Sequence, residues 1–251
     1  MMIKLSLSVK KEPWRDIDPR TEWIDDVFAK QRLVLVDKML DQHGWITCEG
    51  CGARTRPKKN TSGFFEVHHR NDKHDDHRLE NLALLCPFCH QVFHFGLACM
   101  RHRAHLIWCP EWPQSMINRM AHDVGSLVVM GDHAGFQPAC AHYLRKTWDT
   151  LSRRQEQAIQ LLGDHAGEDL ANALLYAQQL NPNLKQHDTL TQGWKLLPDI
   201  EHHEWRASFL FWGDLLKGVR QQAEQEWNKR FSIIPQRILP EEESLVDQGE
   251  P

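Results

Sequence analysis

Two Cys-x-x-Cys pairs constrain this chain more than any other feature of its sequence. Cys48 and Cys51 form the first pair, Cys86 and Cys89 form the second, and 34 residues separate the two pairs. Each pair places two thiolates on one side of a tight turn, within reach of a single tetrahedral Zn²⁺ ion. Gly50 permits the sharp first turn. The spacing predicts a structural zinc site, and redox-active or accidental pairs are the less favoured alternative.

Composition sets the context for this site. The chain has 251 residues, of which 41% are hydrophobic and 25% are charged, as is ordinary for a globular protein. Its net charge of −4 excludes a global basic field, so nucleic-acid binding would need a local patch. The sequence shows no membrane span and no signal peptide. We therefore expect a cytoplasmic protein whose cysteines are thiols or metal ligands, with Cys99, Cys109 and Cys140 as buried small side chains.

The histidines between and after the cysteine pairs follow a recognisable order. Residues 66–94 read EVHHRNDKHDDHRLENLALLCPFCHQVFH. The side chains suited to metal binding or proton transfer come in the order His68, His69, Asn81, His90 and His94. A hairpin with a His pair, then an Asn, then a helix with His is the HNH, or ββα-metal, pattern. Residues 48–94 resemble the four-cysteine variety of HNH endonuclease.

That resemblance implies roles for individual residues. His69 would be the general base that activates water, and Asn81 would hold the loop that carries it. His68 and His90, joined by His94 one helical turn later, would hold one Mg²⁺, Mn²⁺ or Ni²⁺ ion. The alternative is that these histidines are structural or surface residues of a zinc knuckle. Basic residues near the site could contact DNA phosphates, although neighbouring acids partly cancel their charge.

The rest of the chain reads as mainly helical. We expect a helix at 21–43, a hairpin at 45–56, a strand at 64–68, a polar loop at 70–80 and a short helix at 87–96. A strand at 104–110 is followed by helices at about 113–130, 137–150, 152–163, 167–180 and 200–230. The predicted fold class is α+β, mostly α. A small ββα zinc module with treble-clef-like knuckles packs on a helical C-terminal part.

These elements suggest a division of the chain into four parts. We predict an N-terminal lead-in at 1–20, the zinc module with its preceding helix at 21–103 and a helical domain at 104–239. The last part, 240–251, carries five acidic residues and no basic ones. Such a segment predicts a solvated, disordered tail.

A second resemblance covers more of the chain. The stretches WRDIDPRTEWIDDVF, ITCEGCGARTR, FCHQVFHF and HLIWCPEWPQSMINRMAHDV resemble the IcmJ/DotN family of type IVB secretion and conjugation systems, over about residues 13–200. The resemblance implies a component of the coupling complex. Such a component binds the C-terminal segment of the coupling ATPase, with small adaptor proteins nearby, and helps to recruit substrates. It would be cytoplasmic and reach the inner membrane only through its partners.

Three hypotheses follow from the two resemblances. We favour the coupling-complex component, because its match extends well beyond the zinc module. The alternatives are an active HNH endonuclease and a zinc-dependent nucleic-acid binder that performs no chemistry. Trp205, Phe209 and Trp212 share one face of an expected helix and could form a stripe that binds a partner. The more frequent meaning of such a stripe is a helix face buried in the core.

Overall fold

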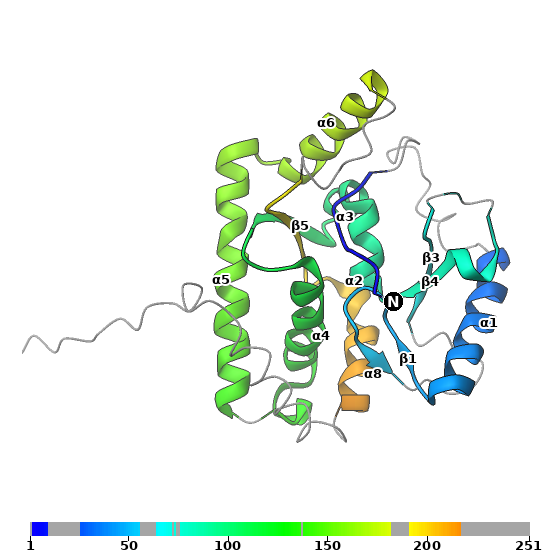
Figure 1. Cartoon of the computed structure of the whole chain (residues 1–251). Coiled ribbons are helices and arrows are strands. Elements are labelled where there is room, and N and C mark those ends of the chain that lie inside the picture. The colour runs from blue at the N-terminus through cyan, green and yellow to red at the C-terminus, as the bar shows by residue number, and fades with distance from the viewer. Residues whose placement is uncertain are drawn as a thin grey trace, which may run out of the picture.

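The computed structural model of the whole chain is shown in Figure 1. It describes residues 2–9, 26–55, 64–71, 73, 76–136, 138–181 and 191–216. Several expectations fall outside these ranges: the first turn of the helix at 21–43, the end of the helix at 200–230, most of the lead-in and the acidic tail. The predicted domain boundaries stay a prediction.

The described residues are mostly helical, as expected. The helices are α1 (Asp26–His43), α2 (Pro87–His90), α3 (Phe95–Met100), α4 (Gln114–Met130), α5 (Pro138–Leu162), α6 (Ala166–Leu180) and α8 (Arg206–Leu216). Short 3₁₀ turns at Leu79–Asn81, Gln91–His94, Gly131–Ala134 and His203–Trp205 connect some of them. Gly44 ends α1 with a φ of +71°, a left-handed conformation that glycine adopts without strain.

The strands of the described chain form small antiparallel pairs. They are β1 (Ile46–Thr47) with β2 (Arg54–Thr55), β3 (Glu66–His69) with β4 (Leu82–Leu85), and β5 (Ala104–Trp108) with β6 (Trp194–Pro198). The first two pairs and α2 build the ββα module that the fold prediction requires. The third pair lies in the helical part, where α5 packs against β5. The α+β fold class, mostly α, is confirmed.

Two local predictions in the helical part were wrong. α5 is one continuous helix, whereas we expected a break near residue 151. The chain has no glycine or proline there, and buried Trp148 and Leu151 give the helix a continuous apolar face. β6 was not predicted, because the five-residue run WKLLP does not alternate. Its partner β5 lies far away in the sequence, so only tertiary packing reveals the pair.

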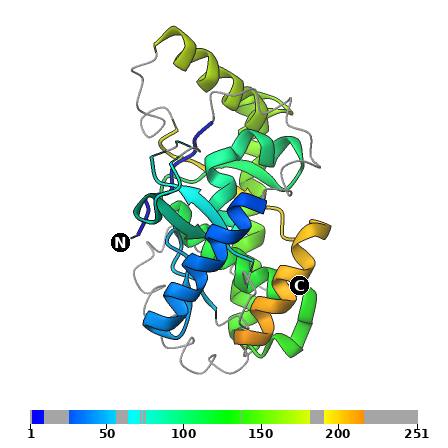
Figure 2. The same ribbon diagram turned by 90° about the vertical axis from the view of Figure 1, so that its right-hand side faces the viewer.

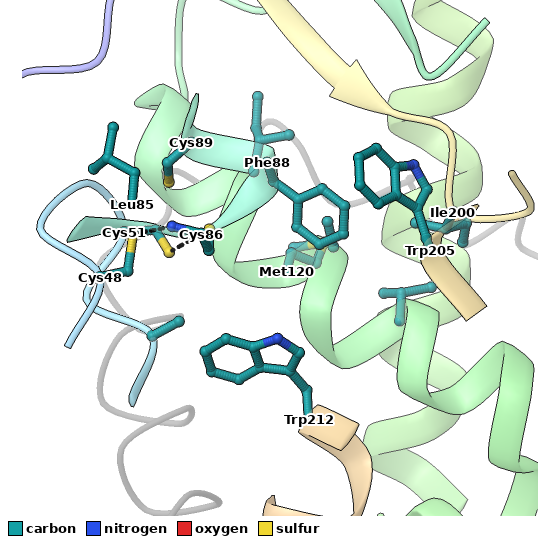
Figure 3. Close-up of a cluster of buried hydrophobic side chains, with 14 of the residues drawn as sticks. Cys48, Cys51, Leu85, Cys86, Phe88, Cys89, Met120, Ile200, Trp205 and Trp212 are labelled. Carbon is teal, nitrogen blue, oxygen red and sulfur yellow. Dashed lines mark hydrogen bonds between the residues drawn. The ribbon is translucent and has the colours of Figure 1, made fainter. Parts of the chain in front are cut away.

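The ββα module and the helical part share one hydrophobic core. Phe88, between the cysteines of the second pair, contacts the rings of Trp205 and Phe209 with centroid separations of 5.2 Å and 5.6 Å. Figure 3 shows Phe88 reaching from the cysteines towards Trp205. α4 and α8 pack so closely here that a Cβ added at Gly125 would lie only 2.1 Å from Phe209 Cε1. The module is therefore built into the helical part.

The aromatic stripe belongs to this core. Trp205, Phe209 and Trp212 are all buried, and Trp212 keeps only 1% of its surface exposed. Its ring packs against Phe65 of the ββα module, with centroids 5.7 Å apart. This packing matches the interpretation of the stripe as core, and it leaves the three side chains no surface with which to bind a partner.

The N-terminal segment, residues 2–9, lies along the ββα module. The amide of Ile3 donates to Glu49 O at 2.7 Å, and the amide of Ser8 donates to Val92 O at 3.3 Å. Leu7 is buried in a second apolar cluster with Val92 and neighbours from α3 and α6. The segment thus connects the first cysteine turn to the helix that follows the second. Within the described residues, no helix is both long and apolar enough to cross a membrane.

His122 is a deeply buried titratable side chain in the core that α4 shares with the ββα module. It is 1% exposed, packs between Phe88 and Trp212 at centroid distances of 4.7 Å and 4.4 Å, and neither ring nitrogen has a hydrogen-bond partner among the described residues. Burial, with a smaller effect from the charge of Arg119, lowers the pKa of His122 to about 3. The folded protein therefore keeps this imidazole neutral.

This burial predicts a specific loss of stability in acid. The folded-state pKa lies below the unfolded value of about 6.5, so stability falls as pH drops below 6.5, by about 1.4 kcal/mol per unit. Between pH 7 and pH 5 the contribution of His122 is about 2 kcal/mol. His122→Phe should lose less stability than the wild type over this range, measured by urea unfolding with excess zinc. His133→Gln, which changes an exposed histidine, is the control. Equal losses in wild type and His122→Phe would contradict the prediction.

Candidate functional site

The four cysteines of the two pairs meet at one point. Cys48 and Cys51 lie on the turn between β1 and β2, and Cys86 and Cys89 lie at the start of α2. Their Sγ atoms all lie within 4.8 Å of one another, and the four side chains are buried (Figure 3). This is the arrangement that the Cys-x-x-Cys spacing predicted. The fold brings the pairs together because the β3–β4 hairpin closes the 34-residue segment between them.

The surroundings of the sulfur atoms fit a bound metal ion. Cys48 Sγ accepts hydrogen bonds from the amides of Cys86 at 3.2 Å and Gly50 at 3.4 Å, which stabilise a thiolate. A Cβ at Gly50 would lie 2.8 Å from Cys89 Sγ, so only glycine fits beside the cluster. Four buried sulfur donors suit a soft or borderline cation such as zinc. The cluster can therefore bind a metal such as zinc.

The pKa shifts of the cysteines also favour a bound cation. Burial opposes ionisation of Cys48, but hydrogen bonds with the other three thiols outweigh it and hold the pKa of Cys48 well below its usual range. Burial, with the hydrogen bonds to Cys48 and Cys51, raises the pKa of Cys86 and of Cys89 well above that range. The protein alone thus resists several thiolates in one place. A divalent cation offsets their mutual repulsion.

Three of the expected histidines gather on one side of the β3–β4 hairpin. The ring of His68 stacks on Phe93 at 4.1 Å between centroids and lies 6.0 Å from the ring of His90. The ring of His90 lies 5.0 Å from that of His94, one helical turn later. Glu66 is hydrogen-bonded to His90 Nδ1. Burial opposes ionisation of Glu66, but the hydrogen bond and charge interaction with His90, with smaller effects from Arg103 and Arg32, outweigh burial and lower the pKa of Glu66.

His69 is directed elsewhere. Neighbouring residues of a strand point to opposite faces, so His69 does not join His68 and His90. Its side chain is 4% exposed, and its Nε2 lies 3.4 Å from Nδ1 of His77, at hydrogen-bonding distance. His77 lies in the polar loop that the sequence predicted at residues 70–80. The expected general base is thus buried and already bonded within the protein.

Asn81 fastens the loop that follows His69. Its Oδ1 accepts from the amide of Asn71 at 3.1 Å, and its Nδ2 donates to Asn71 Oδ1 at 2.9 Å and to Asp76 O at 2.8 Å. Its carbonyl accepts from the amide of Arg70 at 2.8 Å. These bonds attach Asn81 to Arg70, Asn71 and Asp76. Whether Asn81 has its expected role in catalysis stays a prediction.

The second metal site also stays a prediction. Among the described residues, the cysteines are the group of three or more candidate ligands whose donor atoms come together. His68, His90 and His94 do not form a second such group in this part of the chain.

The sequence reasoning missed Glu66. Glu66 and His68 are two residues apart on one strand, so strand alternation alone places them on the same face. That signal could have identified Glu66 as a neighbour of the histidine site. Phe93 lies between His90 and His94 in the sequence, and this position could have identified it as another neighbour of the site.

Comparison with protein families agrees with this geometry. The model of the HNH endonuclease family matches residues 48–95. The chain contains an HNH domain. The matched residues include both cysteine pairs, the β3–β4 hairpin and the histidines that follow α2, so the four-cysteine cluster belongs to this domain. No curated protein matches the chain.

Metal removal should disturb the helical part as well as the HNH domain. Phe88 joins the second cysteine pair to Trp205, so we expect chelation to shift tryptophan emission to longer wavelength and to lower the melting temperature. Elemental analysis should give one zinc per chain, and Cys86→Ser should bind it at least tenfold more weakly. Cys140→Ser, outside the cluster, is the control. An unchanged emission spectrum after complete metal removal would show that the core does not depend on the cluster.

Proposed function

We propose that this protein is a zinc-binding component of the coupling complex of a type IVB secretion or conjugation system, with the HNH domain as a structural scaffold. One observation carries the choice of scaffold over enzyme. His69, the residue that would act as general base, is 4% exposed and bonded to His77. An imidazole held in this way would have to break its bond to His77 before acting as a base, which supports a structural role for it.

The way in which the HNH domain is built into the helical part supports the same proposal. Phe88 and the cysteines share one core with Trp205, Phe209 and Trp212. A scaffold needs a fixed connection to the surface that binds its partner, and this shared core would provide one. The resemblance of about residues 13–200 to the IcmJ/DotN family also extends far beyond the HNH domain.

The proposal includes the partners and the metal. The partner is the C-terminal segment of a membrane-anchored coupling ATPase, joined by adaptor proteins, and the complex recruits substrates for transfer. The protein would sit in the cytoplasm and reach the inner membrane through this partner. The metal is zinc, because four cysteine donors are typical of structural zinc sites.

Among the described residues, α6 exposes two large apolar side chains that such a segment could cover. Figures 1 and 2 show α6 extending at one end of the molecule. Tyr176 and Leu180, one turn apart on α6, are 63% and 70% exposed. An extended peptide with apolar side chains could cover this stripe, and such anchors usually dominate binding.

Binding of the coupling ATPase segment tests the proposal. We expect a one-to-one complex of micromolar affinity or tighter, measured by calorimetry with purified full-length chain and the segment. The double variant Tyr176→Ser and Leu180→Ser should bind at least tenfold more weakly. Leu161→Ser, which removes an exposed leucine at the end of α5, is the control. The absence of binding at 100 µM or so would contradict the coupling-complex proposal.

A second candidate, an active HNH endonuclease, is favoured by two observations. The family match covers residues 48–95, and His68, His90 and His94 lie on one side of the hairpin. In that case His69 would accept a proton from water, and Asn81 would hold its loop. His68, His90 and His94 would hold a divalent ion, which when bound supplies charge stabilisation at the phosphate.

A plasmid assay separates the two candidates. Zinc-loaded protein is incubated with supercoiled plasmid and Mg²⁺, Mn²⁺ or Ni²⁺, beside His69→Ala and the exposed-site control His133→Ala. On the scaffold proposal, no preparation nicks the plasmid. The endonuclease would be established instead if the wild type and the control nick the plasmid and His69→Ala nicks it at least a hundredfold more slowly. Binding that weakens steeply with salt, without nicking, would indicate a nucleic-acid binder.

A further inference from the structure

A buried hydrogen-bond chain leads from the metal-binding cysteines into the helical part. Asn118 on α4 is completely buried, and its Nδ2 donates to Cys89 Sγ at 3.4 Å and to Phe88 O at 2.9 Å. The neighbouring Arg119 donates to Gly52 O at 3.3 Å, beside the first cysteine pair. α4 therefore contacts both cysteine turns. Neither residue lies in the segment that matches the HNH family.

The series of hydrogen bonds continues through the side-chain amide of a second residue, Gln114. Gln114, also buried, donates from Nε2 to Asn118 Oδ1 at 2.8 Å and to Leu196 O at 2.6 Å. Its Oε1 accepts from the amide of Leu196 at 2.8 Å. The side chain of Gln114 thus pairs with β6 as a neighbouring strand would. Buried amides are costly to leave unpaired, so both side chains are held in one arrangement.

The donor at Cys89 differs from the other N–H donors around the sulfur atoms. Cys48 receives its bonds from backbone amides of the HNH domain itself, at Gly50 and Cys86. Cys89 receives its bond from a side chain on another element. Hydrogen bonds to a ligand atom orient it and adjust its electron donation, and their loss typically weakens metal binding by about 10- to 100-fold.

We propose that Asn118 is a positioning residue of the metal centre, supplied by the helical part, and that the Asn118–Gln114 pair makes metal binding and the placement of β6 depend on each other. The inference concerns the cysteine cluster and holds whether the protein is a scaffold or a nuclease. It implies that residues 48–95 taken alone would lack one determinant of their own metal affinity.

Metal competition and a spectroscopic signature test the proposal in the full-length protein. Asn118→Ala should bind zinc about 10- to 100-fold more weakly in competition with a chromophoric chelator. With Co²⁺ in place of zinc, its sulfur-to-cobalt charge-transfer band should move to lower energy, because a thiolate without its N–H donor gives up electron density more easily. Asn172→Ala on α6 is the matched control and should change neither value.

Gln114→Ala distinguishes the bond at Cys89 from the bonds at β6. This variant leaves the Asn118 donor beside Cys89 and removes the bonds to β6. We expect weaker zinc binding with an unchanged cobalt band, together with faster hydrogen exchange at the amide of Leu196. In wild-type protein, zinc removal should speed the same exchange.

A measurement on the unaltered protein covers the case in which Asn118→Ala does not fold. In ¹⁵N-labelled, ¹¹³Cd-loaded protein, scalar coupling across N–H···S–Cd should appear at the side-chain amide of Asn118. The backbone amides of Gly50, at the same 3.4 Å, and Cys86 are internal references. Coupling at the references and not at Asn118 would overturn the proposal. So would wild-type zinc affinity and an unshifted cobalt band in folded Asn118→Ala.

Discussion

The meeting of four buried sulfur atoms within 4.8 Å is the constraint from which the rest of the structure follows. Burial and mutual repulsion oppose several thiolates in so small a volume, and a bound cation offsets that cost. To bring the pairs together, the 34-residue segment between them must fold back on itself, and the β3–β4 hairpin does this. The hairpin in turn carries His68 and His69, so the histidine site takes its position from the cysteine cluster.

The cluster also organises the helical part. Phe88 lies between the two cysteines of the second pair and enters the apolar core formed by α4 and α8. Asn118 adds a polar link at the same place, from α4 to Cys89. Apolar packing and buried hydrogen bonds thus connect the same two parts of the chain. Such a connection fits the proposed scaffold, in which the metal site would maintain the shape that a partner recognises.

Strand geometry explains why the histidine pair has two different environments. On β3, His68 faces Phe93 and His90, whereas His69 faces His77. The alternation of side chains along the strand fixes this division before any function is considered. The arrangement keeps the set of residues typical of an HNH domain while burying the one that would have to meet the substrate. This burial is the observation on which the scaffold proposal rests.

The sequence by itself determined the metal module and its family. Cysteine spacing and the order of His and Asn are local patterns, and ligand chemistry allows few arrangements of them. Most helices were also predictable from apolar periodicity. Tertiary structure alone decided that β6 pairs with β5, that Trp205 belongs to the core, and that Asn118 reaches Cys89. These features depend on neighbours far away in the sequence. A local pattern shows which face of an element is apolar or polar, but the element that covers that face is decided by packing of the whole chain.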